Sequence, residues 1–424
     1  MLNQEFLSIA ADANQDTDNF RGGESQMTYF RIDTLQEAKK ILSQATLEER
    51  IKRSETFLDG LEYRSRISQG MHDRGEAYVF ANHPLETEKD DGGHRNHLPI
   101  YVRTFSIPEK TVAEGEIWDI TMHPEEWGVD EKEEMYNIVN IGKLNLEKNA
   151  IVIVRGNALI LTCQELIKKV ASINEFDIGI LGTPHGFGFR KGDIDGCHGC
   201  AGKNGFTGDH GKEPAFGANF LGKVLHPTFD PESLHGTSGE DGRQGGDGED
   251  GLNGGACRIA EINIRSLVGT IPLVIGAISG NGGNGGQGGN GGNGGNGGIG
   301  VDSVKTFNKT FGPGRGGPGG NGGNGGHGGK AGHNGISSNV FVNIPKQSIG
   351  YVQCFSRAGT PGIPGKGGLP GSGGTGGLSG RNLDSQREEE AKSGKNGLPG
   401  RDGKEGRNMP KAKIYINNEF NMDF

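Results

Sequence analysis

"GNGGNGGQGGNGGNGGNGGIG" occupies residues 280–300, and glycine fills two of every three places in it. Asn or Gln takes most of the remaining places, so the stretch has almost no side chain to bury. A flexible linker needs no register, whereas a period of three is the signature of a left-handed extended helix with three residues per turn. That helix makes no internal hydrogen bonds, so its buried N–H and C=O groups need partners on neighbouring helices. Only glycine lets neighbours come that close, and glycine therefore marks the contact faces.

Glycine keeps this period in six runs, at 196–211, 236–254, 280–300, 314–335, 359–380 and 394–406. The runs at 280–300 and 314–335 have glycine at two of the three phases, and each phase lies on one face. We expect these two runs at the centre of a bundle or facing the strands, and the other four at its periphery. The predicted contact faces are Gly282, Gly283, Gly285, Gly286, Gly291, Gly292, Gly322 and Gly323.

Strand-like segments separate the runs and precede them. "IYVRTFSI" and "EIWDIT" read as strands, and residues 137–162 are short alternating runs broken by "EKN" and "RGN" turns. Ile262-Asn263-Ile264 and Val342-Asn343-Ile344 each begin a strand, link, strand and glycine order, which indicates a degenerate repeat. The sequence fits a β-sandwich and a β-solenoid equally well.

The fold class expected is mainly β plus polyglycine-II, with short N-terminal helices and an intramolecular bundle of about six Gly-X-X helices connected by strands. The spacing of apolar residues predicts helices at 33–42, capped by Asp33 or Thr34, and at 46–60. The predicted domains are 1–97, a helical attachment region, 98–185, a β domain, and 186–424, the bundle. A trimer of collagen-like chains, which "GLPGRDGKEG" (397–406) favours, and disorder are the alternatives.

Composition excludes several classes of protein. Of 80 glycines in 424 residues only 12 precede residue 181, so an ordinary apolar core is expected only in the first part. The net charge of −9 argues against nucleic-acid binding, which needs a basic stripe. The first residues contain no basic and apolar signal and no membrane span, so we expect a cytoplasmic protein or one delivered by a virion or another route independent of Sec. Five cysteines, unevenly spaced, do not form a disulfide framework.

The runs "GNGGNGGQGGNGG" and "GPGGNGGNGGHGG" resemble the glycine-rich receptor-binding adhesins at the fibre tips of T-even phages, and also the snow flea antifreeze protein. The resemblance covers roughly residues 186–410 and concerns architecture alone, so no binding residue is transferred. It implies a folded polyglycine-II bundle.

Candidate catalytic or metal chemistry is weak. "CHGC" (197–200) would place Cys197 and Cys200 about 9 Å apart on such a helix, too far for a disulfide or a compact chelate. "HRNHL" (94–98), with Asp90, Asp91 and His123, reads as a solvated loop, and no nucleophile stands beside a base. We therefore expect no enzyme, no metal site and no cofactor.

The leading hypothesis is a non-enzymatic structural and surface-recognition protein, either an adhesin-like fibre component or a self-assembling fibre subunit. Its partners would be itself or an assembly partner through the N-terminal region, and a cell-surface receptor. Ice binding by the Asn-bearing face is the alternative function, and a metal-dependent enzyme is the less favoured one. Binding residues are expected in the longest insertion between glycine runs, 212–235, because recognition concentrates in aromatic residues on loops held by a rigid scaffold. They are Phe216, Phe220, His226, Phe229 and His235.

Overall fold

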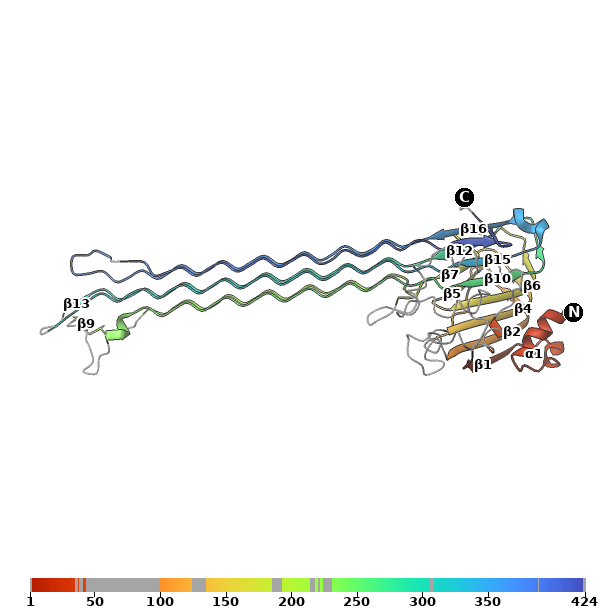
Figure 1. Ribbon diagram of the computed structural model, residues 1–424, viewed down its shortest axis with the longest axis horizontal. Coiled ribbons are helices and arrows are strands. Elements are labelled where there is room, and N and C mark those ends of the chain that lie inside the picture. Colours follow the sequence, from red (N-terminus) through yellow and green to blue (C-terminus); the bar gives the residue numbers. More distant parts are fainter. Residues whose placement is uncertain are drawn as a thin grey trace, which may run out of the picture.

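The computed structural model describes residues 2–34, 99–123, 135–184, 193–213, 231–305, 309–387 and 389–421, and the isolated positions 37, 41, 42, 218, 219, 222 and 223. These residues are mainly β, as the sequence predicts, with short helical segments. Strands gather at one end of the molecule, and the glycine runs extend from them as a long rod (Figure 1).

The N-terminal segment forms a short helix and an edge strand. Helix α1 (Gln4–Asp12) begins after Asn3, whose side chain accepts the N–H of Phe6 at 2.9 Å. Phe6 packs edge-on against Phe20 of the 3-10 helix η1 (Asn19–Gly22), with ring centroids 5.1 Å apart. Strand β1 (Gln26–Ile32) then pairs antiparallel with β2 (Ile100–Val112). Most of the helix expected at 33–42 and all of the helix expected at 46–60 lie outside the described residues.

Two sheets form the base of the molecule. The larger has the order β1-β2-β4-β6-β10-β15-β17-β18, with β11 also paired to β6, and the smaller has the order β16-β12-β7-β5-β3. The larger sheet adds β4 (Met135–Leu146), β6 (Ala158–Lys168), β10 (Ala260–Ile264), β11 (Leu267–Val268), β15 (Val340–Asn343), β17 (Ile414–Ile416) and β18 (Glu419–Phe420). The smaller contains β3 (Ile117–Asp119), β5 (Ile151–Arg155), β7 (Ile178–Leu181), β12 (Leu273–Ile278) and β16 (Val352–Arg357). From β2 to β17 the chain alternates between the sheets, apart from the short β11, and successive strands within each sheet are parallel.

The apolar core lies between these sheets. It contains Val139 and Leu161 of the larger sheet and Val152, Ile180 and Ile275 of the smaller, all at most 1 % exposed. Parallel strands buried on both faces read as continuous apolar runs, which explains why "AIVIVRGNALILT" lacks strict alternation. The two resembling motifs lie side by side, since Ile262 is in register with Val342 and Asn263 with Asn343.

A buried ion pair closes the turn between β6 and β7. Lys168 Nζ contacts Asp177 Oδ2, and the two side chains are 4 % and 2 % exposed. Lys168 also donates to the carbonyl oxygen of Pro272 at 2.7 Å, and Asp177 accepts the N–H of Val274 at 2.7 Å. The pair therefore joins the β6–β7 turn to the start of β12.

The six glycine runs, called runs 1 to 6 in chain order, continue the two sheets. Runs 1, 3 and 5 follow β7, β12 and β16 of the smaller sheet, and runs 2, 4 and 6 lead into β10, β15 and β17 of the larger. The chain thus travels outward in one layer and returns in the other, three times (Figure 1).

Hydrogen bonds at every third residue join the runs. Gly199 of run 1 donates to Asn284 of run 3 at 2.8 Å, and Gly202 donates to Gln287 at 2.7 Å. The same regularity joins runs 3 and 5, runs 2 and 4, and runs 4 and 6, and joins each run to the next in the chain. Runs 3 and 4 therefore have four bonded neighbours each, and the other runs have two or three. The two runs expected at the centre are the two with most neighbours.

Short elements turn the chain at the far end of the rod. They are β8 (Ala218–Asn219) paired with β9 (Gly222–Lys223), η5 (Pro231–Leu234), and β13 (Val304–Lys305) paired with β14 (Thr310–Phe311). A further 3-10 helix, η6 (Lys346–Tyr351), links β15 to β16 at the base. The division into domains at residue 185 stays a prediction, and strands on both sides of that residue belong to the same two sheets.

Candidate functional sites on the rod and its ends

Of the predicted binding residues, the structure describes only His235. Phe216, Phe220, His226 and Phe229 lie outside the described residues, between runs 1 and 2. His235 is described and half-buried, and its Nδ1 accepts the N–H of Arg315 at 2.8 Å while its Nε2 lies 3.5 Å from Glu232. This side chain is thus part of the bonding between runs 2 and 4, a role that sequence reasoning missed.

The glycines singled out as contact faces lie against neighbouring runs. Gly292 donates to Arg243 of run 2 at 2.8 Å, and Gly291 donates to Leu369 of run 5 at 2.8 Å. Gly282 and Gly285 also bond to run 5, Gly283 and Gly286 to run 2, Gly322 to run 6 and Gly323 to run 3. A Cβ added at any of the eight would overlap a carbonyl oxygen of an adjacent run.

The Asn and Asp side chains between the glycines bond the runs laterally. The N–H of each residue at this phase points along the outer face of its layer, where no backbone carbonyl reaches it. Asn290 donates its N–H to Asn204 Oδ1 at 2.8 Å, and Asn290 Oδ1 accepts the N–H of Leu369 at 2.8 Å. Equivalent bonds recur along run 3 through Asn281, Asn284, Gln287, Asn293 and Asn296. These side chains therefore substitute for the missing acceptor, whereas sequence reasoning treated them as a repeating face and did not predict this bonding role.

Asn290→Ser is consequently expected to cost about 1 kcal/mol, because a shorter hydroxyl loses the bond to Leu369 across an exposed face. Asn290→Asp keeps an acceptor at the same reach and is the matched control. The measurement is the urea midpoint of each variant, and a loss for Asn290→Ser no larger than that of the Asp variant would contradict the assigned role.

In runs 5 and 6, too, backbone N–H groups donate to side-chain acceptors, and two prolines lie opposite each other between such bonds. Gly367 and Gly373 donate to Asp402 Oδ1 and Asn396 Oδ1, each at 2.9 Å. Between these pairs, Pro370 lies opposite Pro399, where one residue has no N–H to donate and the other no side-chain acceptor. At these three levels donor and acceptor are present together or absent together, whereas Pro364 lies opposite Glu405, an acceptor without a donor.

The cysteines form no site. Cys197 and Cys200 are free on run 1, and the Glu249 carboxylate beside Cys200 raises the pKa of that thiol. Burial raises the pKa of Cys163 and of Cys354 to about 12, so neither is a reactive thiolate at neutral pH. Among the described residues, no three His, Cys, Asp or Glu side chains converge as a metal site would require. The loop with Asp90, Asp91, His94 and His97 lies outside them.

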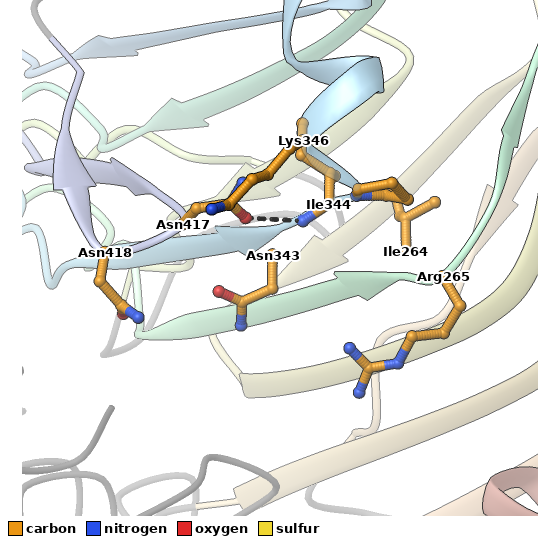
Figure 2. A pocket seen from close by; sticks show the side chains of 8 residues that line it. Ile264, Arg265, Asn343, Ile344, Lys346, Asn417 and Asn418 are labelled. Atoms are coloured by element: carbon orange, nitrogen blue, oxygen red, sulfur yellow. Dashed lines mark hydrogen bonds between the residues drawn. The ribbon is translucent and has the colours of Figure 1, made fainter. Parts of the chain in front are cut away.

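A polar pocket of about 360 Å³ lies at the base, away from the rod (Figure 2). Two cations, Arg265 and Lys346, line it, and Arg265 is paired with Glu5 of α1, its Nε lying 3.0 Å from Glu5 Oε2. Asn417 Oδ1 accepts the N–H of Ile344 at 2.9 Å (Figure 2), and Asn343 Nδ2 donates to Asn263 at 2.8 Å. The polar groups of this pocket mostly join β10, β15 and β17 to one another and to α1.

Comparison of the chain with protein-family models, with curated proteins and with solved structures finds no match in any of the three. Of the helices that the structure describes, none combines the length and the apolar character that crossing a bilayer requires.

Proposed function

We propose that the chain is a β-solenoid that carries six polyglycine-II helices as a stiff rod, and that it acts as an adhesin-like surface-recognition protein. The observation that carries this proposal is the unbroken set of lateral bonds along six runs, with sheets at one end and chain turns at the other. Because every run is bonded to at least two others, bending the rod would break many bonds at once. At a rise of about 3.1 Å per residue, run 3 alone spans about 60 Å.

Rod and tip have different chemical character, which supports recognition at the tip. The faces of the rod offer Asn, Lys and small residues at a fixed spacing, and most of the Asn carbonyl oxygens of run 3 already accept a backbone N–H. The insertion between runs 1 and 2 contains three Phe residues, and binding energy usually concentrates in such side chains. The resemblance to phage fibre-tip adhesins favours the same division of roles.

Ice binding is less well supported by the same faces. A flat repeat of Asn is interrupted by Lys330 and Arg315 on run 4 and by Lys366 on run 5, and charged groups keep water bound to the protein. An ice-recrystallisation assay on the purified chain separates the two functions, since an adhesin leaves crystal growth unchanged.

Phe220→Ser/Phe229→Ser is expected to abolish attachment while leaving the melting temperature within about 2 °C, because both residues lie outside the glycine runs in the sequence. Attachment is measured as adsorption of fluorescently labelled chain to a panel of bacterial and animal cells, with unlabelled chain as competitor. Phe206→Ser is the matched control, because Phe206 is an exposed aromatic residue on the shaft of run 1. A melting temperature that falls together with attachment would mean that the Phe residues cap the bundle and bind nothing.

A further inference from the structure

One outer face of the rod carries two oppositely charged rows. This face, called the 2-4-6 face, belongs to the layer of runs 2, 4 and 6. Its residues on run 2 are Ser238, Asp241, Gln244, Asp247, Asp250 and Asn253, called the acidic row. Its residues on run 6 are Lys392, Lys395, Leu398, Arg401, Lys404 and Arg407, called the basic row. Run 4 lies between them and bonds to both.

Hydrogen bonds across the face place the two rows level with each other. Asp241 Oδ1 accepts the N–H of Asn321 at 2.5 Å, and Asn321 Oδ1 accepts the N–H of Lys395 at 2.9 Å. Asp241 and Lys395 therefore lie at the same height on the rod.

The same relation recurs along the face. Asp247 accepts the N–H of His327 at 2.6 Å, and His327 Nδ1 accepts that of Arg401 at 2.9 Å. Asp250 bonds to Lys330, and the next residue of run 4, Ala331, bonds to Lys404. Each acid is thus level with a cation.

Leu398, the uncharged residue of the basic row, has its own level partner in the acidic row. Asn324 of run 4 receives the N–H of Leu398 at 2.7 Å and accepts, at its carbonyl, the N–H of Gly245 at 2.9 Å. Leu398 is therefore level with Gln244. The one uncharged position of the basic row is thus level with an uncharged position of the acidic row, whereas Asn253, at the end of the acidic row, is level with Arg407.

These charges are exposed, and most have no ion-pair partner among the described residues. Within that part of the chain, Lys395, Arg401, Lys404, Asp241 and Asp247 form no ion pair. Asp250 is the exception, since Lys330 Nζ lies 3.0 Å from its second oxygen. A face with unpaired rows of both signs is complementary to a copy of itself.

We infer that the 2-4-6 face binds a second copy of the chain in a parallel, two-fold symmetric dimer. The two-fold axis runs parallel to run 4, between the two chains. A half-turn about it lays the acidic row of one chain over the partner's basic row. Because both rows have the same rise and the same level, Asp241, Asp247 and Asp250 then meet the partner's Lys395, Arg401 and Lys404 without any shift along the rod. Symmetry forms every pair twice, and both tips point the same way.

The symmetry also excludes other arrangements. An antiparallel pair made by this face would lay the acidic row over the partner's acidic row, which like charges disfavour. The parallel contact uses one face of each chain and closes on itself, so it produces dimers and no filament. The inference goes beyond the proposed function, because it needs only the bonds and charges of the rod and holds whether or not the tip binds a target.

Light scattering after size exclusion tests the dimer at about 50 mM and about 500 mM salt, since the Debye length falls from about 14 Å to about 4 Å over that range. We expect twice the monomer mass of 44.8 kDa at low salt and the monomer mass at high salt. A chain that stays monomeric at low salt at about 100 µM, many times above a micromolar Kd, overturns the proposal.

Two variants isolate the charges from the fold. Asp241→Asn/Asp247→Asn/Asp250→Asn keeps the side-chain acceptors, as Asn253 shows by accepting the N–H of His333 at 2.9 Å, and removes the charge. Lys395→Glu/Arg401→Glu/Lys404→Glu reverses the basic row, whose side chains bond to nothing. Both are expected to weaken dimerisation at least about tenfold, the order of a few exposed ion pairs, with unchanged melting.

The matched control is Lys203→Glu/Lys212→Glu/Lys366→Glu, which changes net charge equally but lies on run 1, directly after run 1 and on run 5, respectively. We expect it to dimerise like the original chain, and equal weakening by control and reversal would overturn the assignment of the face.

Mixing gives the final arm of the test. The basic-row reversal and Asp241→Lys/Asp247→Lys/Asp250→Lys should each be monomeric alone and should form a mixed dimer together, because each supplies the row the other needs. The Lys variant also loses three side-chain acceptors and is expected to melt lower, so both variants are compared at a temperature where circular dichroism shows them folded. Failure of the mixture under these conditions overturns the pairing. A low-salt monomer that binds heparin through the basic row would replace it with a polyanion-binding surface.

Discussion

Gly292→Ala is expected to destabilise the protein by about 3 kcal/mol or more, because the new Cβ overlaps the carbonyl oxygen of Phe206 and separates run 3 from run 1. Gly292 itself donates to Arg243 at 2.8 Å and accepts the N–H of Gly323 at 2.8 Å. Moving run 3 to relieve the overlap stretches these bonds as well. Each buried group left without a partner costs about 1–3 kcal/mol, and at least two are affected.

The control is Gly246→Ala on run 2, a glycine at a phase where Arg243 and Glu249 carry side chains. A Cβ there meets its nearest atom, the nitrogen of Lys203, at 3.2 Å, so we expect a change within about 0.5 kcal/mol. The stability of both variants is measured by urea unfolding with a spectroscopic probe of the two sheets. Hydrogen exchange of the amides in the glycine runs provides the second measurement. Equal losses for the two would show that the glycine phases do not distinguish contact faces from open ones.

Lys168→Met should cost about 3–5 kcal/mol, since it leaves Asp177 charged and buried without its cation. The Asp177 side chain is 2 % exposed, so water does not replace the lost partner. Methionine fills a similar volume, which separates the electrostatic effect from a cavity.

A second variant tests whether the unpaired charge of Asp177 causes the loss of stability. Lys168→Met/Asp177→Asn removes both charges and keeps an acceptor for the N–H of Val274, so it should be more stable than the single variant. Thermal melting of both proteins gives the comparison. A double variant no more stable than Lys168→Met would mean that the ion pair is not what holds the β6–β7 turn to β12.

Parts of the fold could be predicted because they follow from local pattern. The phase of glycine distinguishes runs 3 and 4, which have four bonded neighbours, from runs with side chains at two phases. Apolar runs such as that of β6 predict buried strands, and the motif at Asn263 and Asn343 predicts the repeat whose strands lie in register. Helix α1 was missed, although Asn3 as N-cap and apolar Phe6, Ile9 and Ala10 at helical spacing were present.

Other parts depend on which run lies beside which, and the sequence alone does not state this. Whether Pro370 can lie opposite Pro399 is decided by the pairing of runs 5 and 6. The level match between Asp241 and Lys395 appears only once run 4 is placed between runs 2 and 6. The bonding role of Asn290 could have been predicted from the sequence. The N–H of each residue at that phase needs an acceptor, and the backbone carbonyls already accept the N–H groups of other residues.

Amide hydrogen exchange at residues 282–298 tests whether the six glycine runs form one hydrogen-bonded bundle. We expect the amides of Gly285 and Gly286, which are bonded to runs 5 and 2, to exchange as slowly as the strand amides of β4 and β6. Exchange is measured by mass spectrometry on peptides from run 3, with those strands as the internal reference. Exchange of run 3 at the rate of an unfolded chain, while β4 and β6 stay protected, would contradict the bundle.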